Sequence, residues 1–170
     1  MGVKAKEIAN VDINKLLEML NSALAEEWLA YYQYWIGARV MEGPMRSEVE
    51  PELLLHATQE LNHAVLVCDR IIQLGGTPVL HPQDWFKHAG CAYDAPTDPY
   101  IQVILEQNLA GERCAIKRYN EIATFTNGKD HMTHQMATQI LSEEIEHEND
   151  IEDWITDLER MKEQLLKLKM

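Results

Sequence analysis

Two glutamate–histidine pairs with the same spacing carry the clearest chemical signal in the sequence. Glu60 and His63 are three residues apart, as are Glu144 and His147, so each pair lies on one face of a helix. Both pairs fall within apolar repeats, where an ionisable side chain is costly to bury unless something neutralises it. The two pairs are therefore candidate catalytic and metal-ligating residues, and the rest of the chain must position them.

Two single glutamates repeat at matching places in the two halves of the chain. Glu27 precedes Glu60 by 33 residues, and Glu112 precedes Glu144 by 32. The distance from Glu27 to Glu112 is 85 residues, and that from Glu60 to Glu144 is 84. The two halves thus agree in register, which indicates a divergent repeat of one helical hairpin.

The elements that carry these residues are predicted from apolar periodicity. Repeats at spacings of three and four predict four long helices, over about residues 12–41, 48–75, 98–126 and 130–168. Asp12, Ser47 and Asp98 are expected to cap the first three, because such side chains accept hydrogen bonds from helix N-termini. The stretch 76–98 lacks periodicity and is long enough to cross a bundle from end to end. We predict an all-α, up-down four-helix bundle with one long crossover between helices two and three.

In such a bundle, four carboxylates and two imidazoles would converge at mid-height. Four buried negative charges require compensation, which two divalent cations would provide. One glutamate on each of two helices, with Glu-x-x-His on each of the other two, is the di-iron or di-manganese pattern of ferritin-like bundles. Mixed oxygen and nitrogen donors suit iron, manganese or zinc, and a redox role favours iron or manganese.

Composition limits the protein's partners and location. The 170 residues, 46% of them hydrophobic, are expected to form a single domain, 1–170. With 15 basic and 28 acidic residues the formal charge is −13, which makes nucleic acid an unlikely partner and cations natural ones. No apolar stretch long enough to span a membrane occurs, and we expect a soluble, cytoplasmic protein with no membrane partner.

The sequence around the donors resembles bacterioferritin over about Leu16 to Leu158. The resemblance rests on Glu27 with the run 29–34, on Glu60-Leu61-Asn62-His63, on Glu112, and on Glu143-Glu144-Ile145-Glu146-His147. It implies that Glu27 and His63 are terminal ligands of one metal ion. Glu112 and His147 would be terminal ligands of the other ion, and Glu60 and Glu144 would bridge the two. Bacterioferritin places its haem-ligating methionine where Leu61 stands, so no haem is expected.

The positions of two cysteines make the resemblance more specific. Cys91 in the crossover and Cys114, two residues after Glu112, are similar in placement to the paired cysteines of Dps-like proteins called thioferritins. That resemblance implies a redox-active or disulfide-forming pair and a homo-oligomeric shell of 12 subunits. The absence of a fifth helix after residue 168 disfavours the larger bacterioferritin cage. Cys68 is interpreted as a core residue.

The resemblance implies an iron-storing, peroxide-detoxifying ferroxidase with two iron ions per subunit. Fe(II) would be oxidised by hydrogen peroxide, or by dioxygen, and Fe(III) stored in the shell. The alternative is a non-storing di-metal peroxidase or catalase, similar to rubrerythrin or manganese catalase. A helical interaction module with a vestigial site is a third class, disfavoured because all six donors are present.

The remaining polar residues have simpler interpretations. Tyr34 and Tyr119 follow Glu27 and Glu112 by seven residues, and we expect each hydroxyl to hydrogen-bond a carboxylate across the bundle, a role favoured over radical chemistry. Orientation of the metal ligands is the intermediate interpretation. Five other histidines lack this register and are expected in loops or on the surface: His56, His81, His88, His131 and His134. His131 and His134 could form a weak exposed metal site.

Overall fold

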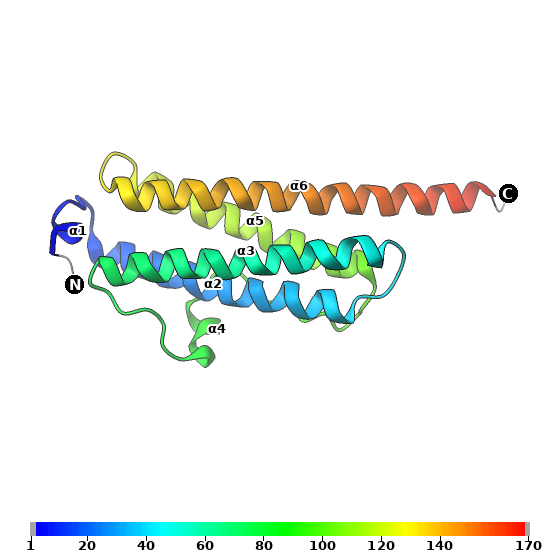
Figure 1. Ribbon diagram of the computed structural model, residues 1–170, viewed down its shortest axis with the longest axis horizontal. Coiled ribbons are helices and arrows are strands. Elements are labelled where there is room, and N and C mark those ends of the chain that lie inside the picture. The colour runs from blue at the N-terminus through cyan, green and yellow to red at the C-terminus, as the bar shows by residue number, and fades with distance from the viewer. Residues whose placement is uncertain (1–2, 169–170) are drawn as a thin grey trace.

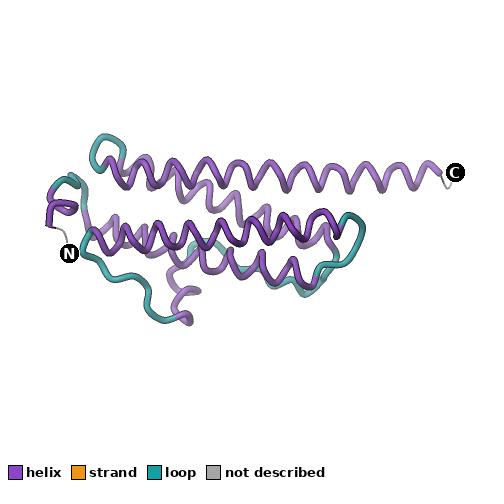
Figure 2. Tube along the Cα trace, viewed as in Figure 1, coloured by secondary structure: helices purple, strands orange, loops and turns teal. Residues whose placement is uncertain are grey.

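The computed structural model describes residues 3–168, and within them it contains helices and one isolated β-bridge but no strand (Figures 1 and 2). The four long helices are α2 (Ile13–Val40), α3 (Arg46–Gln73), α5 (Ile101–Thr126) and α6 (His131–Leu168). Shorter elements are α1 (Val3–Glu7), the 3-10 helix η1 (Pro82–Asp84) and α4 (Trp85–His88). The predicted all-α four-helix bundle is confirmed. None of the helices in this part of the chain is both long and apolar enough to cross a membrane.

The bundle consists of two antiparallel hairpins, α2–α3 and α5–α6, joined by the predicted crossover (Figure 1). The crossover runs from the end of α3 to the opposite end of the bundle, where it pairs with the α2–α3 turn. There Glu42 N donates to Pro99 O at 2.7 Å and Ile101 N donates to Glu42 O at 2.8 Å. At the other end, Asn10 N donates to Lys129 O at 2.9 Å. Both ends of the bundle are therefore tied by backbone hydrogen bonds.

The predicted cap of the first helix is confirmed, whereas that of the second is wrong. Asp12 Oδ1 accepts from Lys15 N at 3.1 Å. The Ser47 hydroxyl instead donates to Glu48 Oε2 at 3.0 Å, and α3 begins at Arg46 after Met45, whose φ is 62°. The turn ending at Met45 already directs its carbonyl to the amide of Val49, at 3.0 Å. The helix therefore starts before Ser47.

The predicted cap of the third helix is also wrong, because α5 starts at Ile101, three residues after Asp98, and its N-cap is Tyr100. Asp98 Oδ1 accepts from Tyr100 N at 3.0 Å, but residues 99–101 are engaged in pairing with Glu42, which keeps the backbone extended until Tyr100. The fourth helix starts after Asp130, whose Oδ1 accepts from Thr133 N at 3.3 Å.

Asp130 also forms a buried ion pair that ties α3 to the α5–α6 turn. Both of its carboxylate oxygens accept from Arg70 Nη2 at 2.8 Å, and Arg70 Nε donates to the Thr133 hydroxyl at 2.7 Å. The two charged side chains are almost completely buried. Removing either charge would leave the other without a partner in a site closed to water.

Asp130→Asn is expected to destabilise the protein by about 3–5 kcal/mol, the usual cost of breaking a buried ion pair. Asparagine still caps a helix N-terminus, so the loss reports the ion pair. Thermal and denaturant unfolding of the purified protein measure it. The control is Glu148→Gln, which removes an exposed contact with Arg113 and should cost much less. Equal losses in the two variants would contradict a special role for the buried pair.

The apolar core is divided into two clusters, each built from all four long helices. The first lies towards one end and includes Leu16, Leu20, Ala64, Val67, Ile71, Ile122, Ala137 and Ile140. The second lies towards the other end and includes Ala38, Met41, Val49, Leu53, Ile101, Leu105, Ile151 and Leu158. Between them in each helix stands one of the predicted glutamates, so a layer of charged groups separates the clusters.

Candidate metal centre

The structure brings together all six predicted donors in this layer. Each is at most 3% exposed: Glu27, Glu60, His63, Glu112, Glu144 and His147. The described residues offer two groups whose potential ligand atoms lie within 4.8 Å of one another. One group contains Glu27 and His63, the other contains Glu112 and His147, and both contain Glu60 and Glu144.

The first group is arranged around His63 Nδ1. This nitrogen lies 3.3 Å from Glu144 Oε1, 3.4 Å from Glu60 Oε2 and 3.6 Å from Glu27 Oε2. Three carboxylate oxygens and one imidazole nitrogen thus face a common point. This is a donor set that iron, manganese or zinc accepts.

The second group repeats the arrangement around His147 Nδ1. The nitrogen lies 3.2 Å from Glu60 Oε1, 3.3 Å from Glu144 Oε2 and 3.6 Å from Glu112 Oε2. Glu60 and Glu144 each turn one oxygen towards His63 and the other towards His147. This division of oxygens is what two bridging carboxylates require, whereas Glu27 and Glu112 each face one group only.

Seven atoms of the six donors are buried without a hydrogen-bond partner: Glu27 Oε2, Glu60 Oε1, His63 Nδ1, Glu112 Oε2, both carboxylate oxygens of Glu144, and His147 Nδ1. The facing groups lie at charge-pair distance but are not aligned as hydrogen bonds. Buried polar atoms normally have partners. Unpartnered oxygens and nitrogens that converge from four helices therefore fit a pair of metal ions.

The pKa values of the buried glutamates and histidines in the metal-free protein also reflect an excess of negative charge in this layer. Burial, with the negative charge of Glu60, raises the pKa of Glu27 well above its ordinary value, and burial with Glu144 does the same for the pKa of Glu112. Burial alone would lower the pKa of His147, but the facing carboxylates raise it to about 12. Without metal, the layer thus retains protons, which metal ions would displace.

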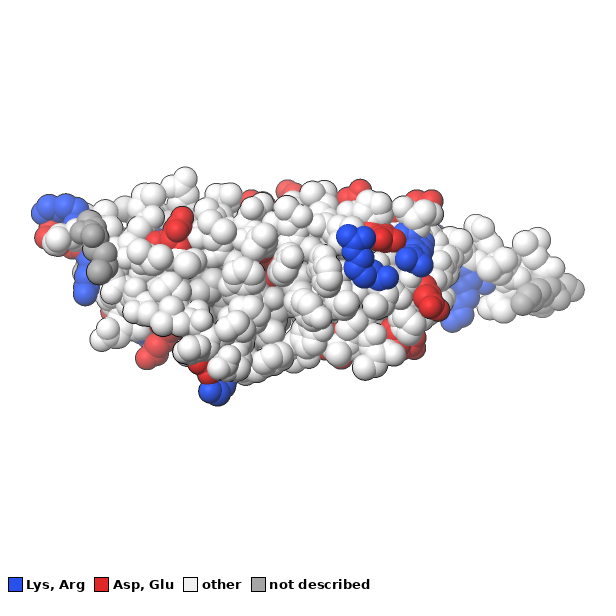
Figure 3. Space-filling view, turned by 60° about the horizontal axis from the view of Figure 1, so that its bottom comes forward, with Lys and Arg blue, Asp and Glu red and all other residues white. Residues whose placement is uncertain are grey.

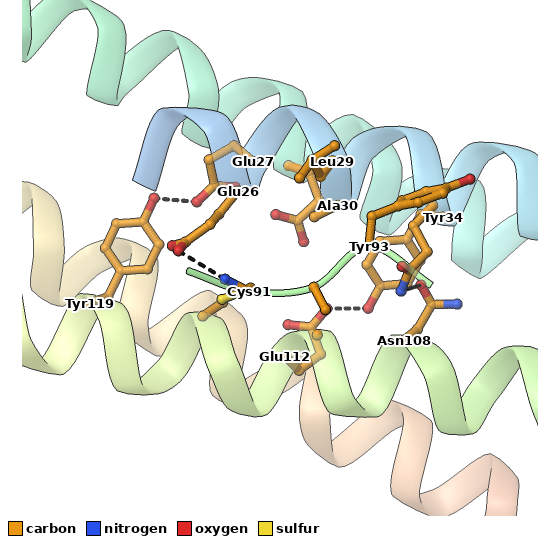
Figure 4. Close-up of a pocket in the computed structure, with 15 residues that line it drawn as sticks. Glu26, Glu27, Leu29, Ala30, Tyr34, Cys91, Tyr93, Asn108, Glu112 and Tyr119 are labelled. Carbon is orange, nitrogen blue, oxygen red and sulfur yellow. Dashed lines mark hydrogen bonds between the residues drawn. The ribbon is translucent and has the colours of Figure 1, made fainter. Parts of the chain in front are cut away.

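Each of the two tyrosines donates a hydrogen bond to a carboxylate across the bundle, as expected. The Tyr34 hydroxyl donates to Glu112, and the Tyr119 hydroxyl donates to Glu27 (Figure 4). Each bond links one hairpin to the other. Burial and the neighbouring carboxylates raise the pKa of both hydroxyls, so both remain protonated donors.

Two outer partners of the histidines were missed by the sequence analysis. Glu143 Oε2 lies 2.9 Å from His63 Nε2, and Gln59 Oε1 lies 3.1 Å from His147 Nε2. Each partner directly precedes one of the two glutamates shared by both groups, and each contacts the histidine of the other hairpin. The repeated position before Glu60 and Glu144 was the available signal. With Nε2 engaged, each imidazole presents Nδ1 to the metal centre.

The expectation that His56 lies on the surface is wrong. It is 2% exposed, its ring stacks on that of His147 at 4.1 Å between centroids, and its Nε2 lies 3.4 Å from Asp150 Oδ2. Burial, together with His147, lowers its pKa to about 3. His56 precedes Glu60 by one helical turn and so shares its inward face. The equivalent position in the second half is Ile140, so the comparison of halves did not reveal it.

His131 is exposed, and His134 Nδ1 lies 2.9 Å from Ala123 O. Neither belongs to the two potential metal groups that the described residues form. Cys68 is half-buried at the edge of the first apolar cluster.

A narrow cavity of about 40 Å³ reaches the metal centre from beneath the crossover (Figure 4). Its walls include Glu27, Glu60, Glu112, Tyr34, Tyr119 and Cys91. Such a volume has room for molecules of the size of water or hydrogen peroxide. The structure joins Cys91 to Cys114 in a disulfide, with their Cα atoms 5.8 Å apart. The disulfide fixes the crossover to α5 beside this cavity.

Glu26 also holds the crossover in place. Its carboxylate accepts from Gly90 N at 2.7 Å and Cys91 N at 3.2 Å, and from Arg118 Nε and Nη2 at 2.9 Å. A Cβ atom at Gly90 would lie 2.5 Å from Arg118 Nη2 and 3.2 Å from Glu26 Oε1. Glycine at this position therefore lets the crossover approach the ion pair.

Gly90→Ala is expected to loosen the crossover and to speed reduction of the disulfide between Cys91 and Cys114. The added methyl group displaces Arg118 and weakens the hydrogen bond from the Cys91 amide to Glu26. The measurement is the rate of thiol release at a fixed concentration of dithiothreitol. Ala95→Ser, an exposed change in the same crossover, is the control. An unchanged rate in Gly90→Ala would show that Glu26 does not limit access to the disulfide.

Fold and site together define a ferritin-like four-helix bundle with a paired carboxylate–histidine centre. The ferritin-like domain profile matches residues 17–161, and the chain belongs to this family. In structure it is similar to a dodecameric thioferritin, the bacterioferritin-related protein from Bacteroides fragilis, with 52% identity, a TM-score of 0.95, and coverage of 97% of this chain and 99% of that chain. It is 38% identical to the DNA protection during starvation protein of Pyrococcus furiosus, over 88% of this chain and 82% of the relative. It is 32% identical to a bacterioferritin from Rhodobacter capsulatus, over 63% of this chain and 61% of the relative.

Proposed function

We propose that the protein is a ferroxidase that oxidises Fe(II) at the centre formed by its six donors and stores Fe(III) in a homo-oligomeric shell. The observation that carries the proposal is the division of the oxygens of Glu60 and Glu144 between two groups of donors. Two ions held side by side can deliver two electrons together. Family membership and the similarity to a thioferritin support the same function.

The chain's own residues would hold the substrate iron and control access to it. Glu27 and His63 would bind one ion, Glu112 and His147 the other, and Glu60 and Glu144 both. Bound iron supplies the electrons, so that two Fe(II) and one hydrogen peroxide, with two protons, give two Fe(III) and two water molecules. Tyr34 and Tyr119 keep the terminal carboxylates oriented by donating hydrogen bonds to them.

Hydrogen peroxide is the proposed oxidant. The cavity beside the disulfide accommodates only small molecules, and its wall combines the carboxylates of the centre with two phenol groups. A relative named for DNA protection during starvation fits a role in removing peroxide together with Fe(II). Haem takes no part in the proposal, because Leu61 stands at the position of the haem-ligating methionine in bacterioferritin.

The proposed shell has 12 subunits, because the thioferritin to which this chain is similar is a dodecamer. Aromatic side chains near the crossover form an apolar surface suited to subunit contact: Tyr32, Trp35 and Phe86 are exposed, and Tyr93 packs against both Tyr32 and Phe86. Figure 3 shows few charged side chains across the middle of the face drawn there. The net charge of −13 favours uptake of cations over binding of nucleic acid.

The test is Fe(II) loading without oxygen, followed by addition of hydrogen peroxide or dioxygen. Absorbance follows oxidation, and size exclusion with light scattering and iron analysis follows assembly and retention. We expect a shell that retains Fe(III) and reacts faster with peroxide. A monomer or dimer that consumes peroxide without retaining iron would instead establish a non-storing di-metal peroxidase or catalase.

A further inference from the structure

The two metal positions of the proposed centre are alike in their direct donors but differ in the groups behind the histidines. The carboxylate of Glu143 lies behind His63, whereas the neutral amide of Gln59 lies behind His147. The two partners occupy equivalent places, each one residue before a bridging glutamate. Each contacts Nε2, the ring nitrogen turned away from the metal centre.

We propose that Glu143 makes the position of Glu27 and His63 the tighter of the two, so that this position takes the first divalent cation. The inference rests on the proposed function, because it concerns the same pair of ions. An imidazole that donates its Nε2 hydrogen to a carboxylate becomes a more basic ligand through Nδ1 than one that donates to an amide. The additional negative charge also attracts the cation directly.

The other charges around the centre do not reverse this difference. Glu27 and Glu112 contribute one carboxylate each, and Glu60 and Glu144 are shared. Asp150 contacts His56, whose ring lies between Asp150 and His147, and the Asp150 side chain is largely exposed. Arg118 is neutralised by the buried Glu26, which accepts two hydrogen bonds from it. Glu143 therefore places a charge in direct contact with His63, whereas the neutral Gln59 occupies the equivalent place at His147.

The test is a stepwise titration of the assembled, metal-free protein with cobalt(II), a probe that oxygen does not readily oxidise in such sites. Competition with a chromophoric chelator gives both binding constants. Repulsion between neighbouring cations separates the two constants in any di-metal site, so the test lies in how variants move each one. Glu143→Gln is expected to weaken the tighter constant by about 10- to 100-fold, with little change in the weaker.

The reverse substitution distinguishes this role from a structural one. Gln59→Glu places a carboxylate behind His147 and is expected to tighten the weaker constant by at least about 10-fold while the tighter one changes little. A residue that only supported the fold would not produce a gain. Glu146→Gln removes the same charge from the exposed face of α6 and should leave both constants unchanged, since Glu146 contacts neither histidine.

Two results would overturn the inference. If the positions were equal in the unaltered protein, Glu143→Gln would lower the weaker constant instead of the tighter one. If Glu146→Gln had the same effect as Glu143→Gln, the contact with His63 would not matter. Binding of two ions per chain in either case would leave the proposed function standing, whereas binding of fewer than two would overturn both.

Discussion

Replacing Glu144 by glutamine is expected to lower the initial rate of Fe(II) oxidation by more than about 100-fold, beyond the range typical of residues that only orient a ligand. Glu144 is fully buried, and its two oxygens face His63 and His147 separately. A glutamine keeps the shape of the side chain but loses the charge that two ions would share. The same loss is expected for Glu60→Gln. Stopped-flow absorbance after mixing anaerobic Fe(II)-loaded protein with peroxide measures the rate.

The matched control for these variants lies on the exposed face of the same helix as Glu144. Glu146→Gln removes an exposed carboxylate two residues from Glu144 and should oxidise Fe(II) at the unaltered rate. All three variants should assemble normally, as judged by light scattering. Rapid oxidation by Glu144→Gln or Glu60→Gln would show that the residue concerned does not bridge the two ions.

Metal binding is expected to produce the largest change in stability. A ligand that binds only the folded state at about 1,000 times its Kd adds about 4 kcal/mol, so two ions would add on the order of 8 kcal/mol. Relief of the excess negative charge among the four buried glutamates is the physical source of this gain. Manganese(II) or zinc(II) should therefore raise the Tm in differential scanning calorimetry, and a chelator should reverse the rise.

A double variant provides the control for this measurement. Glu60→Gln/Glu144→Gln loses both shared charges and should show little rise in Tm on metal addition. A rise in Tm equal to that of the unaltered protein would place metal binding elsewhere on the chain.

The sequence was sufficient to predict the bundle and the convergence of the six side chains, because register alone determines both. One inward residue per helical turn fixes which side chains meet, and Glu27, Glu60, Glu112 and Glu144 occupy corresponding turns. Residues engaged in turns were harder to predict. The cap at Ser47 failed because Met45 adopts a left-handed conformation that starts α3 earlier, and such a turn leaves no periodic signal.

The outer residues of the centre were missed for a different reason. Glu143 lies in an acidic stretch of the kind usually found on an exposed helix face. Its contact with His63 depends on how closely α3 and α6 pack. His56 has no counterpart in the second half, since Ile140 stands there. Its burial depends on stacking against His147 and on packing against the tilted ring of Trp154. Contacts that depend on the spacing between helices do not follow from the spacing within one helix.

The charged layer between the two apolar clusters also affects how the bundle moves. Local opening costs least where apolar contacts are few. In the metal-free protein, the amide hydrogens of residues around Glu27, Glu60, Glu112 and Glu144 should therefore exchange with solvent faster than those at either end. Occupied metal positions would tie all four helices together at this level and slow that exchange. The middle of the bundle, weakest when empty, would become its most rigid part when loaded.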